Sequence, residues 1–335
     1  MKMKLNLLLV VFAIALSCTD ETSNTTDENE PTTENAVPDD TTSDGTTTEN
    51  TTPESQNTNP PNVLGMDYTK SKTTLDETYS ALIASLEANP NIKIVTEVDH
   101  MANAASVDKA LNPTKIVFFG NPNLGTPLMQ KNQLAGLDLP QKILVYQNDE
   151  DEVYAGFNNT TYFGNRHGLT SMEVLPTIQG ALTNLSTGAS QDTLVTAENS
   201  EVDIEEGIII KKVNGSCDAA YTRLRAAIEN NPNLKIIFEL DHKANAAKVN
   251  LELDPTRLIV FGNPNLGTPL MQNAQTTALD LPQKMLLWTE ANGDSYVAYN
   301  DPAFLVYRHG ITENEEVLQT ITGALDKLSD VAVGE

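Results

Sequence analysis

The sequence is poor in the residues that most often form disulfides, bind zinc or act as nucleophiles. Only two cysteines and four histidines occur among its 335 residues. If Cys18 carries a lipid anchor, Cys217 is the one cysteine that remains. This excludes an internal disulfide and a zinc site built on cysteine. Serine and cysteine nucleophiles beside a base at recognisable spacing are also missing.

Positive charge is scarce as well. The chain has 21 Lys and Arg against 46 Asp and Glu, which gives a net charge of −25. No basic patch with interleaved aromatic residues occurs, so we expect no nucleic-acid partner. Electrostatic binding to an anionic lipid surface is equally disfavoured.

Long apolar runs are limited to one segment at the start, Leu5 to Leu16, which follows Lys2 and Lys4. It is shorter than the roughly 20 residues that span a bilayer, so residues 1–17 are predicted to be a signal peptide. The following Ser17-Cys18 resembles a bacterial lipobox, which predicts acylation of Cys18. A cleaved secretory signal with an incidental cysteine is the alternative.

Residues 18–61 are predicted to form a disordered acidic tether. From Thr19 to Asn62 the chain carries eleven acids and no Lys or Arg, with almost nothing apolar to bury. The acids directly after Cys18 are similar to the signal that sends Bacteroidetes lipoproteins to the outer face of the outer membrane. We therefore expect a lipoprotein of the cell envelope whose membrane partner is reached through Cys18.

What is present is a repeat. The eleven residues GNPNLGTPLMQ occur at 120–130 and again, unchanged, at 262–272. The same offset of 142 brings Pro90 onto Pro232 and His167 onto His309 without a gap. The predicted domains are 62–187 and 205–331, joined by a polar linker at 188–204, and each is of ordinary domain size.

Each repeat alternates β-type and helical patterns. In the first, strands are predicted at 66–72, 92–98 and 114–119, with a hairpin at 142–157. Helices are predicted from Thr74, which begins a capping box, and over 170–185. Residues 101–107 fit a short helix or a strand. The fold class is α+β, with two copies of an antiparallel sheet that has helices packed on one face.

The repeated eleven residues predict a strand end, a tight turn and a helix start. Thr126 is expected to cap that helix and Pro127 to occupy its first position. A helix N-terminus beside asparagine side chains suits an anion or an amide. The ligand-binding candidates here are Asn121, Asn123, Thr126, Asn263, Asn265 and Thr268; the alternative is that the stretch repeats for backbone geometry alone.

All four histidines fall in register between the repeats. The candidates added by them and their neighbours are His100, Arg166, His167, His242, Arg308 and His309. If His100 and His167 converge on Asn121, they form an acid–base pair or two ligands of a metal. Alternatively, each histidine satisfies backbone groups at the end of an element.

A resemblance then becomes visible. The order FGNPNLGTPLMQ, LDLPQK, a hairpin and YNDPAFLVYRHG is similar to the family called domain of unknown function 302, over both repeats. The resemblance implies a compact α+β domain whose single-domain members form homodimers, and it implies no reaction. We therefore expect the two repeats to pair with each other through a pseudo-twofold interface that relates residue n of the first repeat to residue n+142 of the second.

The leading functional hypothesis is a cell-envelope lipoprotein with two similar small-ligand-binding domains. The alternatives are a metal-dependent or acid–base enzyme that uses the paired histidines, and a structural scaffold. The sequence identifies no catalytic residue, ligand, metal or cofactor.

Overall fold

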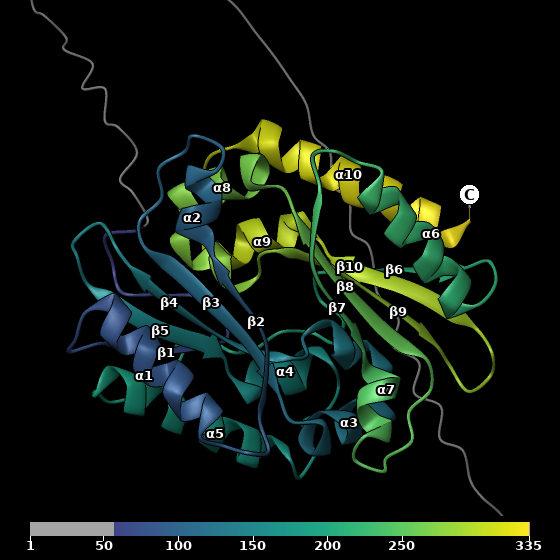
Figure 1. Cartoon of the computed structure of the whole chain (residues 1–335), viewed down its shortest axis with the longest axis horizontal. Helices are drawn as coiled ribbons and strands as arrows, with labels where there is room; N and C mark the ends of the chain where they lie inside the picture. Colours follow the sequence, from purple (N-terminus) through teal and green to yellow (C-terminus); the bar gives the residue numbers. More distant parts are fainter. Residues whose placement is uncertain (1–56, 335) are drawn as a thin grey trace, which may run out of the picture. The chain divides into compact units, whose positions relative to one another are not determined.

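Two five-stranded sheets, one in each repeat, form the framework of the computed structural model, which describes residues 57–334. All strand pairs are antiparallel, and the order is β1-β5-β4-β3-β2 in the first sheet and β6-β10-β9-β8-β7 in the second (Figure 1). The first sheet contains β1 (Met66–Lys70), β2 (Lys93–Asp99), β3 (Thr114–Gly120), β4 (Gln141–Gln147) and β5 (Val153–Asn158). The second contains β6 (Ile208–Val213), β7 (Lys235–Asp241), β8 (Thr256–Gly262), β9 (Gln283–Thr289) and β10 (Ser295–Asn300).

Helices connect the strands in the same order in both repeats. The first repeat has α1 (Leu75–Glu87), α2 (His100–Ala105), α3 (Pro122–Lys131), η1 (Gln133–Leu137), α4 (Thr160–Arg166) and α5 (Leu175–Ser190). The second has α6 (Cys217–Glu229), α7 (His242–Ala247), α8 (Pro264–Asn273), η2 (Gln275–Leu279), α9 (Pro302–His309) and α10 (Glu315–Val333). None of these helices is long and apolar enough to cross a bilayer.

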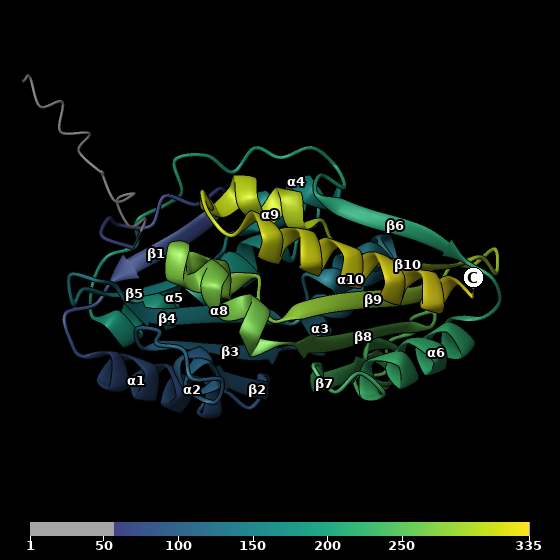
Figure 2. The same cartoon turned by 90° about the horizontal axis from the view of Figure 1, so that it is seen from above.

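One face of each sheet packs on two long helices, as the α+β prediction required. Thr74 begins α1 with the predicted capping box, in which Thr74 and Glu77 bond each other's backbone N–H. Leu82 and Leu86 of α1 are fully buried in a cluster with Val117 and Ile143 of the sheet. The longest helices lie beside this face, α1 with α5 and α6 with α10 (Figures 1 and 2). Cys217 is buried in the equivalent cluster of the second repeat.

The second face of each sheet is buried by the other repeat. Ile116 and Phe118 alternate with Val117 along β3, so they point away from α1 and α5. They belong to a cluster that also contains Ala278 and Leu279 of η2. Burial on both faces explains why β3 reads as a continuous apolar run instead of an alternating one.

Three local predictions need correction. Asn121, and not Thr126, caps the helix of the repeated stretch, and Pro122 takes the first helical position while Pro127 lies inside the helix. The open assignment of residues 101–107 resolves as the short helix α2, because Asp99 caps it through the N–H of Ala102. The helix α4, which follows β5, is not among the predicted elements.

The boundaries of the tether and linker also differ from the predicted ones. Asn57 is already buried, and its side chain donates to the carbonyl of Gln272 and accepts from the N–H of Gln275. Helix α5 continues to Ser190, and Val195 exchanges two backbone hydrogen bonds with Tyr68 at the edge of the first sheet. The predicted signal peptide, Cys18 and most of the predicted tether lie outside the described residues.

Candidate functional site

Two of the cavities between the repeats are built from matching residues. The larger, here called cavity A, has a volume of about 500 Å³. Its walls come from β2, the repeated stretch and α5 of the first repeat, together with α7 of the second. The residues used below are Lys93, Asn121, Thr126, Gln141, Ala181 and, from the second repeat, His242 and Asn245.

The smaller, cavity B, has the same construction with the repeats exchanged. Its volume is about 100 Å³. The matching residues are Lys235, Asn263, Thr268, Gln283, Ala324 and, from the first repeat, His100 and Asn103. Both cavities are therefore composite: one repeat supplies the turn and the apolar body, and the other supplies a histidine and an asparagine.

The repeated stretch forms a capped helix start at the wall of each cavity. The Asn121 side-chain oxygen accepts from the N–H of Asn123 at 3.0 Å, and Asn263 does the same for Asn265 at 2.9 Å. This capping bond explains why Asn is needed there, since it satisfies one of the N–H groups that a helix leaves free. Thr126 and Thr268 are buried one turn further on.

His100 and His242 begin α2 and α7 and are 4% exposed. The Nε2 atoms of both rings have no hydrogen-bond partner among residues 57–334. Burial lowers the pKa of each imidazole to about 4. The smaller opposing effects come from Asp99 on His100, and from a backbone hydrogen bond with Gly136 and the charge of Asp241 on His242. Both rings are therefore neutral at pH 7, with one nitrogen able to donate and the other able to accept.

Two further buried polar atoms in the wall of cavity B have no hydrogen-bond partner within the part of the chain that the structure describes. They are Oγ1 of Thr268 and Nε2 of Gln283. Buried polar groups are hydrogen-bonded in the great majority of cases, and leaving one unpaired costs about 1–3 kcal/mol. An imidazole, a hydroxyl and an amide that are all unpaired around one cavity indicate that a ligand or water supplies the missing partners.

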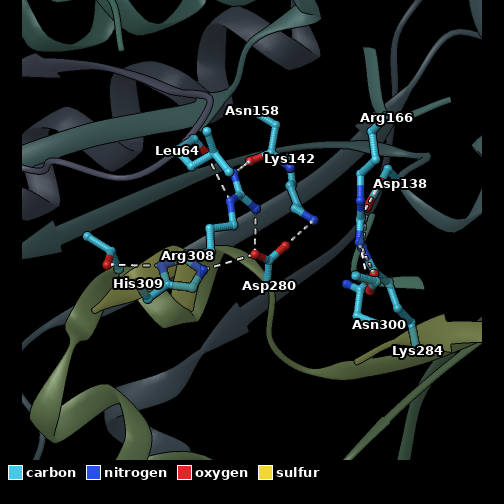
Figure 3. Close-up of polar contacts among 12 residues, drawn as sticks. Leu64, Asp138, Lys142, Asn158, Arg166, Asp280, Lys284, Asn300, Arg308 and His309 are labelled. Carbon is cyan, nitrogen blue, oxygen red and sulfur yellow. Dashed lines mark hydrogen bonds and ion pairs between the residues drawn. The ribbon is translucent and has the colours of Figure 1, made fainter. Parts of the chain in front are cut away.

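A second polar feature is a buried set of charged residues where the repeats meet, here called the central cluster (Figure 3). Asp138 accepts from Arg166 at 2.8 Å, from His167 at 2.9 Å and, across the repeats, from Lys284 at 2.9 Å. Arg166 also reaches across to Asn300 and to the carbonyl of Glu206. These cations hold the pKa of the Asp138 carboxyl well below its usual range, although burial acts in the opposite direction and is the largest single influence.

The second half of the central cluster repeats the first. Asp280 accepts from Arg308 at 2.5 Å and from His309 at 2.9 Å, and Lys142 lies 3.6 Å away across the repeats. Arg308 donates to Asn158 and to the carbonyl of Leu64, the counterparts of the partners of Arg166 (Figure 3). Each contact between the repeats therefore occurs twice: the pair Asp138–Lys284 is matched by Asp280–Lys142, each residue shifted by 142.

The predicted site residues therefore fall into two groups. Cavity A contains Asn121 and Thr126 together with His242, and cavity B contains Asn263 and Thr268 together with His100. Neither cavity wall includes His167 or His309, which bond the aspartates of the central cluster with Arg166 and Arg308. The hypothesis that His100 and His167 share a pocket with Asn121 does not hold for these cavities. The histidine in the wall beside Asn121 is His242 of the other repeat.

Asn123 and Asn265, two of the predicted site residues, are not wall residues of either cavity. Asp301 caps α9, as Asn159 caps α4 at the equivalent place of the first repeat. Sequence reasoning missed Asp138, Lys142, Asp280 and Lys284 as members of a buried cluster. The signal was present, because LDLPQK occurs unchanged at 137–142 and 279–284. Within residues 57–334, no three His, Cys, Asp or Glu side chains gather closely enough to hold a metal ion.

Comparison with known proteins identifies the repeats. The model of the family described as "Domain of unknown function DUF302" matches residues 67–185 and again residues 209–328. "Fluoride-specific ion channel FluC 1" of Brucella suis biovar 1 is 35% identical over 122 residues, 36% of this chain and 48% of that protein. The protein of the same name from Brucella abortus biovar 1 is also 35% identical over 122 residues, 36% of this chain and 45% of its own length.

The chain thus spans just under half the length of these curated relatives. Among solved structures, an uncharacterized conserved DUF302 protein from Bacillus stearothermophilus is 16% identical. That match covers 38% of this chain and 98% of the other, with a TM-score of 0.35.

Proposed function

The chain belongs to the DUF302 family, with two of its domains in tandem, and we propose that it binds small, largely apolar ligands in cavities A and B. The observation that carries the proposal is the pair of unpartnered Nε2 atoms, on His100 and His242, at equivalent places in the two walls. A neutral imidazole in an apolar wall suits a ligand with one hydrogen-bonding group on an apolar body.

The two cavities differ in size, and this sets different expectations for their ligands. About 500 Å³ in cavity A falls within the range of sites for small organic molecules, whereas about 100 Å³ in cavity B holds a few heavy atoms. Cavity A is therefore the principal site. Because its histidine comes from α7, a ligand there contacts both repeats.

The test uses the fluorescent probe 8-anilinonaphthalene-1-sulfonate and a pair of matched variants. Ala181 lines cavity A and Ala324 lines cavity B at the equivalent place of α10, and both are half-buried. Ala181→Phe should fill cavity A and reduce probe binding at least about tenfold, whereas Ala324→Phe should leave it nearly unchanged. Mass spectrometry of the purified protein then identifies any natural ligand lost in Ala181→Phe.

Equal probe binding in the two folded variants would contradict cavity A as the site. Circular dichroism and the unfolding midpoint of each variant serve as the control for folding. His242→Leu provides a second test, because it removes the unpaired nitrogen and keeps an apolar wall.

We also propose that acylation of Cys18 anchors the chain to the outer membrane. The proposal is supported by the apolar segment Leu5 to Leu16, the following Ser17-Cys18 and the acids after it. Cys18→Ala should release the protein from the membrane fraction of cells. A variant that still sediments with membrane lipid would refute the anchor without affecting the proposal for cavities A and B.

A further inference from the structure

The central cluster holds more positive than negative charge. Its four cations are Lys142, Arg166, Lys284 and Arg308, and its two anions are Asp138 and Asp280. The two histidines add no negative charge, and burial lowers the pKa of both rings, which favours their neutral form. With every Lys and Arg protonated, the cluster therefore carries an excess of two positive charges away from water.

The excess positive charge of the central cluster is concentrated on Lys142 and Lys284. Each carboxylate already accepts from one arginine and one histidine of its own repeat. Lys284 takes the remaining oxygen of Asp138 at 2.9 Å, but Lys142 is 3.6 Å from Asp280, beyond hydrogen-bond length. The side chains of Lys142 and Lys284 are 4% and 7% exposed.

The charge of Lys284 also acts on the amine of Lys142. Burial and the neighbouring Lys284 lower the pKa of Lys142 to about 7, and the effects of Asp280 and Asp138 only partly offset this. An ammonium has three donors and no acceptor, so two adjacent ammoniums repel each other unless an acceptor lies between them. Asp138 and Asp280 are the acids that act on Lys142, and both already have several donors.

The hydroxyl of Tyr162, beside the central cluster, is a further donor that makes no hydrogen bond to the described residues. Tyr162 is 1% exposed, and its hydroxyl has no hydrogen-bond partner among residues 57–334. The guanidinium of Arg308 lies over its ring, 4.3 Å from the ring centre. The charges of Arg166, Arg308, Asp138 and Asp280 all act on Tyr162, which places this hydroxyl within the field of both halves of the cluster.

We propose that a small monovalent anion binds between the amines of Lys142 and Lys284 and supplies the missing negative charge. Burying an unmatched charge is costly, and the two carboxylates cannot neutralise all four cations of the cluster. The site lies where the repeats meet, so the anion would act as a structural ion that joins them. This inference is independent of cavities A and B, whose walls include neither lysine.

Bromide is the probe, because it is a halide that anomalous X-ray scattering can locate. Unfolding temperatures are measured for the full chain between 1 and 100 mM sodium bromide, with sodium gluconate added to hold the ionic strength constant. The wild type should gain at least about 2 °C by mass action, whereas Lys142→Met should gain nothing. Lys72→Met is the matched control, since Lys72 is a surface lysine with a 60% exposed side chain that pairs with Asp192, and it should respond like the wild type.

A wild-type crystal grown in bromide gives a second test that needs no folded variant. An anomalous peak between the Nζ atoms of Lys142 and Lys284 would support the site. The proposal is overturned if no such peak appears at 100 mM bromide, or if the wild type and Lys142→Met respond to bromide equally.

Discussion

Lys284 of the second repeat places its Nζ atom 2.9 Å from an oxygen of Asp138 in the first repeat, and both side chains are almost fully buried. The same carboxylate also accepts from Arg166, so one aspartate neutralises cations of both repeats. A buried pair of this kind contributes little net free energy compared with an apolar replacement, but removing one partner leaves the other charge unpaired.

Asp138→Asn should therefore destabilise the protein by about 3–5 kcal/mol, because it leaves Arg166 and Lys284 buried without their counter-charge. Urea unfolding of the fragment 57–334 measures this loss. Asp294→Asn is the control: Asp294 pairs with Lys212 at 2.9 Å, but both side chains are largely exposed, so little loss of stability is expected. A similar cost for both substitutions would contradict the assigned role of Asp138.

Lys142 should make stability rise with pH above neutrality. Its pKa is about 7 in the folded protein and near 10.5 in the unfolded chain, so the unfolded chain holds the proton more tightly between these values. The destabilising effect is complete below pH 7 and is relieved as pH rises towards 10. In gluconate buffer, the free energy of unfolding of the wild type should increase by up to about 1.4 kcal/mol per pH unit. Lys142→Met should lack this increase, and equal slopes for the two proteins would refute the assignment.

His100 and His242 should make the protein sensitive to acid. Each pKa falls from 6.5 in the unfolded chain to about 4 in the folded one, so stability is lost as pH falls from 6.5 towards 4. Each ring should contribute about 3 kcal/mol of this loss. The double variant His100→Gln with His242→Gln should show a shallower fall over that window, whatever its stability at pH 7. An unchanged acid slope would show that these rings are solvated.

The two repeats should remain paired in solution. Gln133 donates to Thr256 across the repeats at 2.8 Å, and Gln275 donates to Thr114 at 2.7 Å. Small-angle scattering of the fragment 57–334 should give a single compact particle with one copy of the chain. Two separated lobes at a variable distance would contradict the pairing, which also underlies cavities A and B.

A matched pair of substitutions tests the same pairing energetically. Gln133→Ala and Gln275→Ala each remove an amide that serves three acceptors of the other repeat. Each should cost about 1–3 kcal/mol, because buried acceptors lose their donors. Costs near zero for both would show that these contacts do not hold the repeats together.

Much of the fold follows from the sequence alone. The offset of 142 defined the repeat, and alternation, apolar spacing and the capping box at Thr74 located the sheet strands and the long helices. Alternation, apolar spacing and capping boxes are local patterns, since each depends on residues within one or two turns of each other. Helix starts were less secure, because Asn121 and Thr126 are both good caps and only the backbone decides between them.

The composition of each site was decided by the tertiary structure. His100 and Asn121 belong to the same repeat, and the sequence offers no reason to separate them. The packing of α2 against α8 and of α3 against α7 places His100 in cavity B and His242, instead, beside Asn121. Likewise, LDLPQK repeats Asp138 and Lys142 four residues apart, yet the buried aspartates take their lysines from opposite repeats. Such exchanges depend on how two folded surfaces meet, which is a long-range property that no local pattern encodes.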